Sequence, residues 1–152
     1  MVAIVRTNSE SKDFRDLVVL LDAELHIRDG EEHAFYAQFN KIDGLGLLGV
    51  VVAYVDDIAV GCGAFKRHSD DVAEIKRMFV MPESRGQRIA AQILAELETW
   101  ARGSGFSECV LETGFKQPEA IALYERSGYE IIPNYGQYAD VANSLCMKKT
   151  LG

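Results

Sequence analysis

The stretch AEIKRMFVMPESRGQRIAA, residues Ala73 to Ala91, decides how this chain folds. Its first part is a strand-like run that stops at Pro82, and a short polar loop, Glu83–Gln87, follows. An amphipathic helix then begins near Arg88. The first amides of a helix lack internal partners and carry the positive end of the helix dipole, and a glycine lets the backbone approach a ligand closely. The segment therefore predicts a strand, a loop and a helix N-terminus that together bind a phosphorylated ligand.

Apolar periodicity along the rest of the chain predicts an α/β fold built on a mixed sheet. Two β-branched runs separated by Asp56-Asp57 indicate a hairpin, and a third strand extends it into an antiparallel meander. Asn8 or Ser9 is expected to cap the first helix. The expected order of elements is β-α-α-β-β-β-α-β-α-β-β. Strands are expected at Val2–Arg6, Gly49–Val55, Ile58–Arg67, Val72–Met81, Ser107–Glu112, Tyr129–Ile132 and Ser144–Lys149, and helices along Phe14–Leu25, Glu31–Phe39, Arg88–Arg102 and Glu119–Arg126.

The length of 152 residues suits one domain, 1–152, with a single core. The longest apolar run, Leu45–Val55, is too short to span a bilayer, and the N-terminus lacks the layout of a signal peptide. Cys62, Cys109 and Cys146 lie far apart without the spacing of a zinc site, so we expect reduced core thiols and no metal. A cytoplasmic enzyme or binding domain without a membrane partner is the expected class.

The distribution of charge points to a small ligand. A formal net charge of −7 argues against broad nucleic-acid binding, which basic surfaces drive by releasing counterions. The segment Lys76–Arg88 departs from this balance, because it holds four basic residues and one acidic residue. A basic island in an acidic protein suits a small polyanionic ligand, and a solvated basic loop explains the island equally well.

Two segments resemble the GNAT superfamily of acetyl-CoA-dependent N-acetyltransferases. The residues after Val80 follow the family's cofactor loop, Arg/Gln-x-x-Gly-x-Gly/Ala, with Arg85 and Ala90 at matching positions and Arg88 where the middle glycine is expected. The segment AIALYERSGY, Ala120–Tyr129, is similar to the family's helix-to-strand pattern A-x-x-L-Y-x-x-x-G-F/Y. The resemblance covers nearly the whole chain in element order, and it implies a GNAT-like acyl-CoA N-acyltransferase fold.

By this resemblance the chain binds acetyl-CoA as its cosubstrate. The backbone of Phe79 and Val80 would pair with the pantetheine arm like one more strand, and the loop amides would hold the pyrophosphate with charge from Arg85 and Arg88. Arg88 would need a backbone conformation available to a non-glycine residue. The implied cofactor-binding residues are Met78, Phe79, Val80, Arg85, Gly86, Gln87, Arg88, Ile89, Ala90 and Tyr124.

The implied reaction is direct transfer of the acetyl group from the thioester to a primary amine of a small molecule or peptide. The amine must lose a proton, the leaving thiolate benefits from an acid, and the oxyanion needs a backbone N–H donor. Tyr124 matches the family's tyrosine beside the sulphur and is the candidate acid, and packing against the sheet is its structural alternative. Glu74 matches a strand glutamate and is the candidate base, directly or through water. A salt bridge to Lys76 or Arg67 is the structural alternative for Glu74.

The acceptor is not identified by any motif. Phe35, Tyr36, Tyr135 and Tyr138 are candidates to line its site, and ordinary packing of aromatic side chains explains them as well. The leading hypothesis is an N-acetyltransferase that acts as a monomer or homodimer, without a nucleic-acid partner. The alternative is a non-catalytic CoA-binding sensor or interaction domain of the same fold, which Arg88 at a glycine position favours. An unrelated nucleotide binder would show GxxxxGK[ST], or GxGxxG directly after a first strand, and neither arrangement is present.

Overall fold

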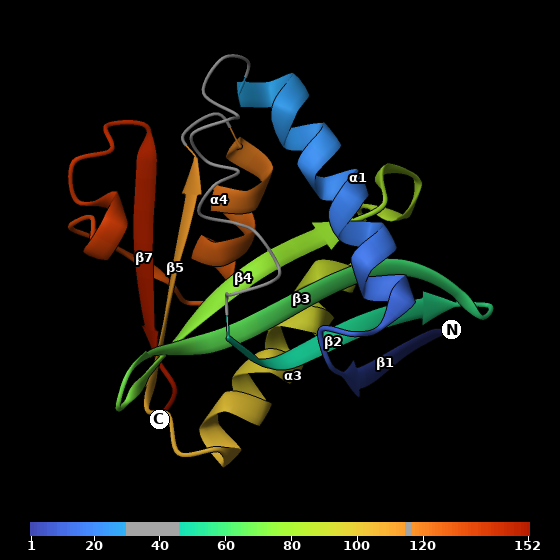
Figure 1. Ribbon diagram of the computed structural model, residues 1–152, viewed down its shortest axis with the longest axis horizontal. Helices are drawn as coiled ribbons and strands as arrows, with labels where there is room; N and C mark the ends of the chain where they lie inside the picture. Colours follow the sequence, from blue (N-terminus) through green and yellow to red (C-terminus); the bar gives the residue numbers. More distant parts are fainter. Residues whose placement is uncertain (30–45, 115–116) are drawn as a thin grey trace.

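A seven-stranded mixed sheet forms the framework of the protein (Figure 1). The computed structural model describes residues 1–29, 46–114 and 117–152. The strand order is β1-β2-β3-β4-β5-β7-β6, in which β4 and β5 run parallel and every other neighbouring pair is antiparallel. The strands are β1 (Val2–Thr7), β2 (Leu47–Val55), β3 (Ile58–Ser69), β4 (Val72–Val80), β5 (Glu108–Gly114), β6 (Glu130–Ile132) and β7 (Ser144–Thr150).

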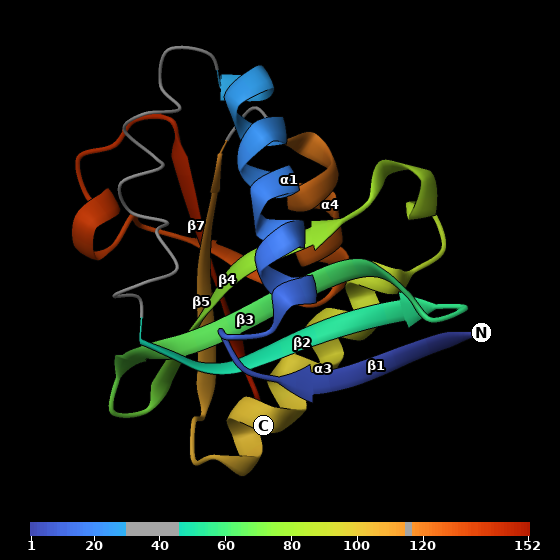
Figure 2. The same ribbon diagram turned by 45° about the vertical axis from the view of Figure 1, so that its right-hand side comes forward.

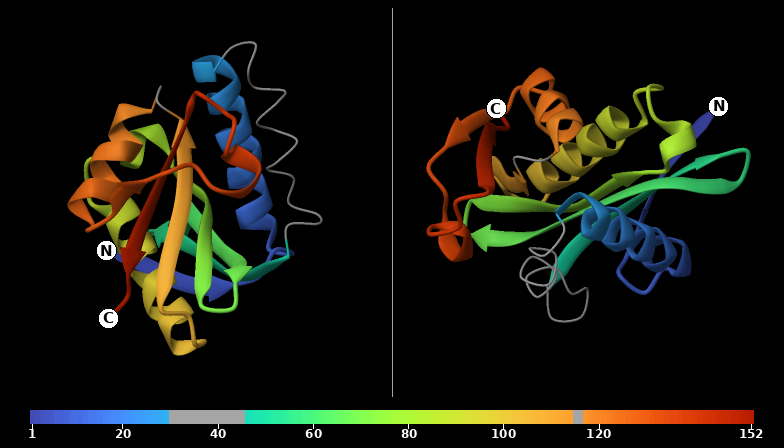
Figure 3. Two further views of the ribbon diagram at one scale, coloured as in Figure 1. Left: turned by 90° about the vertical axis from the view of Figure 1, so that its left-hand side faces the viewer. Right: turned by 90° about the horizontal axis from the view of Figure 1, so that it is seen from above.

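Among the described residues, three α-helices cover the two faces of the sheet. Seen from above in Figure 3, α3 and α4 lie on one side and α1 lies on the other. The predicted α/β fold is confirmed, including a helix that connects the parallel strands β4 and β5. The predicted helix Glu31–Phe39 lies outside the described residues. The helices are α1 (Lys12–Asp29), α3 (Ile89–Gly103) and α4 (Pro118–Arg126), and short 3₁₀ turns occur at η2 (Pro82–Ser84) and η3 (Gly136–Tyr138).

Two apolar clusters pack against the sheet, one on each face. The cluster under α3 and α4 contains the predicted helical stripe of Ile89, Ile93, Leu94 and Leu97. The cluster under α1 includes Phe14 together with side chains of β2 and β3. Cys62, Cys109 and Cys146 are buried as free thiols, as predicted. No helix in the described ranges is long and apolar enough to cross a membrane.

The hairpin between β2 and β3 forms as predicted. Val55 pairs with Ile58, so Asp56 and Asp57 make a two-residue turn. Their φ angles of 51° and 67° lie in the left-handed region. Aspartate tolerates this region better than most residues, and such turns match the twist of the flanking strands.

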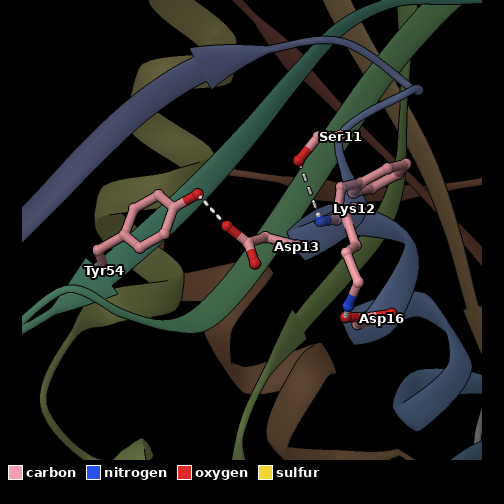
Figure 4. Close-up of polar contacts among 6 residues, drawn as sticks. Ser11, Lys12, Asp13, Asp16 and Tyr54 are labelled. Atoms are coloured by element: carbon pink, nitrogen blue, oxygen red, sulfur yellow. Dashed lines mark hydrogen bonds and ion pairs between the residues drawn. The ribbon is translucent and has the colours of Figure 1, made fainter.

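The residue that caps α1 lies later in the chain than predicted. The Ser11 hydroxyl accepts a hydrogen bond from the Phe14 backbone N–H (3.2 Å), and this caps the helix (Figure 4). The prediction of a cap at Asn8 or Ser9 is wrong. The Asn8 side chain instead accepts from the Glu10 backbone N–H (2.9 Å), so it stabilises the turn that precedes the helix.

A tyrosine of β2 anchors the first turn of α1 to the sheet. The Tyr54 hydroxyl donates to the Asp13 carboxylate (2.7 Å), as Figure 4 shows. An ion pair one turn apart between Lys12 and Asp16 (2.7 Å) lies on the exposed side of the same turn. The contact with Tyr54 places α1 across β2 to β4, so its later turns reach the end of β4.

The parallel strands β4 and β5 pair over only their first residues. The partners are Val72–Glu74 and Glu108–Val110, and beyond them β4 pairs only with β3. A β-bulge adds to the divergence, because Arg77 and Met78 together face the single residue Gly63 of β3. The two strands consequently separate toward their C-terminal ends (Figures 1 and 2). An unpaired strand edge results in the middle of the sheet.

Candidate active site

The unpaired edge of β4 presents a backbone amide at Val80. The Met81 N–H donates to the Val60 carbonyl of β3 (2.7 Å), and Gly61 lies opposite Val80. Hydrogen-bonded and non-hydrogen-bonded pairs alternate along antiparallel strands, so the N–H and C=O of Val80 point away from β3. The C=O accepts from Arg85 Nε (2.9 Å). The N–H is directed toward the side on which β5 no longer pairs with β4.

The loop after β4 leads into a helix N-terminus that no side chain caps within the described residues. Gly86 has a φ of 82°, and Arg88, the N-cap residue of α3, has φ 62° and ψ 20°. The first amides of α3, from Ile89 onward, are therefore available to an anion. Arg88 was expected to need a backbone conformation available to a non-glycine residue. It takes the left-handed conformation that glycine adopts most readily and that other residues adopt at some cost, so the loop can keep the form expected for a glycine at this position.

Arg85 connects the loop to the rest of the molecule. Besides the bond to Val80, its Nη2 donates to Glu24 Oε2 of α1 (2.8 Å). Its guanidinium also lies 5.7 Å from the centre of the Phe79 ring. The predicted contribution of this charge to a pyrophosphate site stays a prediction, because protein groups already engage the guanidinium.

Tyr124, the candidate acid, lies on α4, in the apolar cluster between the sheet and helices α3 and α4. It is buried, and its ring packs edge-on against Tyr129 at 5.8 Å between centres. Burial raises the pKa of Tyr124 well above its usual value, and the Glu112 carboxylate of β5 raises it further. The phenol therefore keeps its proton at neutral pH, which is what a general acid requires.

Glu74, the candidate base, lies on the opposite face at the last residue of β4 that pairs with β5. Its neighbours Ala73 and Ile75 pack in the cluster under α3, and side chains alternate along a strand, so Glu74 faces the α1 side. The side chain is buried and accepts a hydrogen bond from the Tyr135 hydroxyl (2.8 Å). The structure thus brings together a candidate base and a candidate acceptor-site residue.

Lys76, predicted only as a possible salt-bridge partner of Glu74, joins side chains from three segments of the chain. Lys76 is buried, and its Nζ donates to the Tyr138 hydroxyl (3.0 Å) at 4.0 Å from Glu74 Oε2. Burial lowers the pKa of Lys76, and the carboxylates of Glu74 and Glu112 act in the opposite direction. The Ser144 hydroxyl donates to Glu112 (2.7 Å). We refer to Glu74, Lys76, Glu112, Tyr135, Tyr138 and Ser144 as the buried polar cluster.

One signal in the sequence could have found part of this cluster. Glu74 and Lys76 alternate with apolar residues in a strand that is otherwise buried, so both must share one face. Glu112 stands on β5 near the end of the described pairing with β4. Its proximity to Lys76 depends on strand order, which no local pattern states.

The remaining predicted site residues fall into three groups. Phe35 and Tyr36 lie outside the described residues. Met78 packs partly buried against the cluster under α3, whereas Phe79 is buried in the cluster under α1. Gln87, Ile89 and Ala90 occupy the loop and the first turn of α3. Across the described residues, no group of His, Cys, Asp and Glu side chains is arranged to hold a metal ion.

These features fit a phosphorylated thioester cofactor. The Val80 amide suits an extended amide-containing arm, because that arm can pair with it as a strand would. The uncapped N-terminus of α3, with space beside Gly86 where a Cβ would meet no atom within 4 Å, suits a pyrophosphate. The protonated phenol of Tyr124 suits a leaving thiolate.

Comparison with known proteins agrees with this fit. The family model for the acetyltransferase (GNAT) family matches residues 14–129. The chain is 34% identical over 151 residues to an IAA acetyltransferase of Azospirillum brasilense, covering 95% of this chain and 97% of that protein.

Solved structures share the fold over its full length. A putative acyl-CoA N-acyltransferase from Klebsiella pneumoniae superposes with a TM-score of 0.84 at 29% identity, covering 100% of this chain and 99% of the other. The PaiA N-acetyltransferase of Thermoplasma acidophilum, solved in complex with coenzyme A, has a TM-score of 0.72 at 18% identity and 99% coverage of both chains. Together with the loop, the phenol and the diverging strands, the matches identify the chain as a member of the GNAT family and as an acetyl-CoA-dependent N-acetyltransferase.

Proposed function

We propose that the chain transfers the acetyl group of acetyl-CoA directly to a primary amine of a small molecule or peptide. The observation that carries this proposal is the unpaired edge of β4, where the Val80 N–H lies just before the uncapped N-terminus of α3. The strand edge suits the amide-containing arm of CoA, and the helix N-terminus suits its pyrophosphate.

The residues proposed to hold the cofactor lie in one continuous segment. The amides from Arg85 to Ala90 would face the pyrophosphate, with the dipole of α3 behind them. The Arg88 guanidinium adds positive charge at the same terminus. Met78, Phe79 and Val80 would provide the strand along which the arm lies, with Val80 supplying the outward-facing amide.

Acetyl-CoA, when bound, supplies an activated acyl group and a thiolate leaving group. Tyr124 would donate its phenolic proton to the departing sulphur, since burial keeps that proton in place at neutral pH. Glu74 would accept the proton of the incoming amine, directly or through water, from the opposite face of the sheet. Acid and base then act on either side of the point where β4 and β5 separate, so neither obstructs the other.

The left-handed conformation of Arg88 also bears on the non-catalytic alternative. That alternative drew its support from a side chain at a glycine position. Because Arg88 adopts a glycine-like backbone, the loop retains the form that amide donors need. A transferase is therefore the better-supported function, and Tyr124 and Glu74 are its proposed catalytic residues.

Thermal unfolding with single ligands tests cofactor binding. Acetyl-CoA, CoA, ATP and NAD are added separately, and a ligand present at about a hundredfold over its dissociation constant should stabilise the fold by roughly 2.7 kcal/mol. We expect a rise in Tm with both CoA forms and none with NAD. An absent shift with both CoA forms would overturn the proposed binding site.

Release of free thiol from acetyl-CoA, followed across a panel of amines, tests the transfer itself. The product is identified by mass as the N-acetylated amine. We expect turnover with at least one primary amine. Stabilisation by CoA without turnover on any amine or peptide of a broad panel would favour the sensor instead.

A further inference from the structure

Lys76 carries a buried charge that the described protein groups satisfy only in part. Its side chain is 6% exposed, and its hydrogen bond runs to a neutral hydroxyl, that of Tyr138. Glu74 forms a buried ion pair with Lys76, but its Oε2 atom is 4.0 Å from Nζ, beyond hydrogen-bond length, and already accepts from Tyr135. An ammonium has three N–H donors, and no carboxylate among the described residues accepts from this one. A buried charge is costly unless it is paired and hydrogen-bonded, so this environment suits an added anion.

The β-bulge places a second cation beside the first. Lys76 faces the α1 side, and an ordinary strand would turn the next residue to the α3 side. Arg77 instead has a left-handed φ of 62°, and its Nη1 reaches Asp22 of α1 (3.0 Å). The Arg77 side chain is 3% exposed, and its Nε is buried without a hydrogen-bond partner. Two neighbouring buried cations on one face thus have unused donor capacity.

The carboxylates of the buried polar cluster are engaged by neutral donors. Tyr135 donates to Glu74, and Ser144 donates to Glu112. These bonds hold the carboxylates in place, so Lys76 keeps the 4.0 Å ion pair to Glu74 but has no hydrogen-bonded counter-ion among the described residues. A polycationic acceptor placed beside Glu74 would meet the positive charges of Lys76 and Arg77, and repulsion at such short range is strong in a buried site.

We propose that the acceptor amine carries an anionic group, a carboxylate or a phosphonate, and that Lys76 binds this group. The inference rests on the proposed function, because it assigns the acceptor class of the same site. The amine lies toward Glu74 and the anionic group toward Lys76, so a short carbon linker between amine and acid fits best. Arg77 strengthens the local positive potential, and Tyr138 positions the Lys76 ammonium through their hydrogen bond.

Matched acceptors test the proposal. β-Alanine and n-propylamine have chains of similar length and amines of similar basicity, and they differ in the acid group. 2-Aminoethylphosphonate tests the alternative anion, and spermidine tests a polycation. We expect kcat/KM from thiol release to be higher for one of the two acids than for n-propylamine by about tenfold or more, the effect of one charge-assisted hydrogen bond. The acid that performs better identifies the carboxylate or the phosphonate as the source of the charge.

Substitution of Lys76 shows whether that residue is responsible. Lys76→Met removes the charge and keeps most of the side-chain length, and Lys148→Met makes the same change on β7, where the lysine pairs with Glu108 at the surface. We expect Lys76→Met to raise KM for the preferred acid about tenfold more than it raises KM for n-propylamine. Lys148→Met should leave both values as in the wild type. Should Lys76→Met fail to fold, Lys76→Gln keeps a donor for Tyr138 and serves instead.

The outcomes separate this inference from the proposed function. Turnover that is faster on n-propylamine or spermidine than on either acid overturns the inference and leaves the transferase intact. An equal loss on all acceptors in Lys76→Met also overturns it, because a structural role explains a uniform loss. Absence of thiol release with every amine, despite stabilisation by CoA, overturns the proposed function itself.

Discussion

Replacing Arg88 with glycine or with alanine distinguishes the effect of its backbone conformation on stability from the effect of its charge on cofactor binding. Arg88 has φ 62° and ψ 20° at the N-cap of α3, and the residue is exposed. A left-handed conformation costs an L-residue about 1–2 kcal/mol, and glycine avoids this cost. Glycine also gives the unfolded chain more conformational freedom, and this removes about 0.4–1 kcal/mol of the stabilisation gained.

The net change expected for Arg88→Gly is a stabilisation of about 0.5–1 kcal/mol. For a domain of this size that corresponds to a rise in Tm of about 1–4 °C. Loss of the charge acts on binding, where an exposed cation near a phosphate contributes about a two- to fivefold change in Kd. Arg88→Ala loses the same charge and keeps the left-handed conformation, so the two variants should share one Kd and differ in Tm.

Calorimetric titration with CoA at low and high salt, together with thermal unfolding, provides the assay. The difference in Kd between wild type and either variant should shrink at high salt, because salt screens exposed charges. Asp57→Gly is the matched control, since Asp57 has a φ of 67° in the β2–β3 turn, away from the loop. It should leave Kd unchanged. A fall in Tm for Arg88→Gly, or tighter binding of CoA, would refute the argument, and tighter binding would mean that the side chain obstructs the pocket.

Three further results are expected. Tyr124→Phe should lower kcat about 100-fold or more, as expected for loss of a general acid, whereas Tyr129→Phe should keep the turnover of the folded protein. Gly63→Ala should lower the free energy of unfolding by about 1–3 kcal/mol in chemical denaturation, because the new Cβ would lie 2.6–2.9 Å from three core side chains. At Gly103 a new Cβ would have no atom within 4 Å, so Gly103→Ala is the control and should be tolerated. Burial raises the pKa of Cys62 from 9.0 to about 12, so between these values the native state binds more protons than the unfolded state. Above about pH 9 this thiol should therefore lower the free energy of unfolding by about 1.4 kcal/mol for each pH unit. Chemical denaturation at several pH values measures the slope of the unfolding free energy against pH. Cys62→Ala should make that slope less steep by the same amount.

The order of elements was largely predictable, because it follows from local patterns. The apolar stripe of α3, the two-residue turn at Asp56-Asp57 and the helix that starts at Pro118 each depend on residues close together in sequence. The cap of α1 was misplaced at Asn8 or Ser9, since several polar residues precede the helix and only the folded chain selects Ser11. Such boundary errors arise because the same residue types stabilise both turns and caps.

The candidate site was predicted in part. Tyr124 and Glu74 were predicted as acid and base through resemblance, and their roles stay predictions; the structure adds that the two side chains lie on opposite faces of the sheet. Burial of Lys76, its bond to Tyr138 and its proximity to Glu112 were not predicted. They join residues from β4, β5 and the segment before β7, and no local pattern specifies which of these segments become neighbours.

The amino-acid sequence by itself determined the strand, loop and helix between Ala73 and Ala91, because hydrophobic periodicity and the positions of proline and glycine act over a few residues. Only the tertiary structure decided that β4 leaves β5 after Glu74, that a bulge turns Arg77 toward α1, and that Arg88 takes a left-handed conformation. Strand register and divergence depend on pairing between distant segments and on packing of helices on both faces. The loop supplies the chemistry for phosphate, and the long-range arrangement of the sheet creates the edge along which a cofactor can lie.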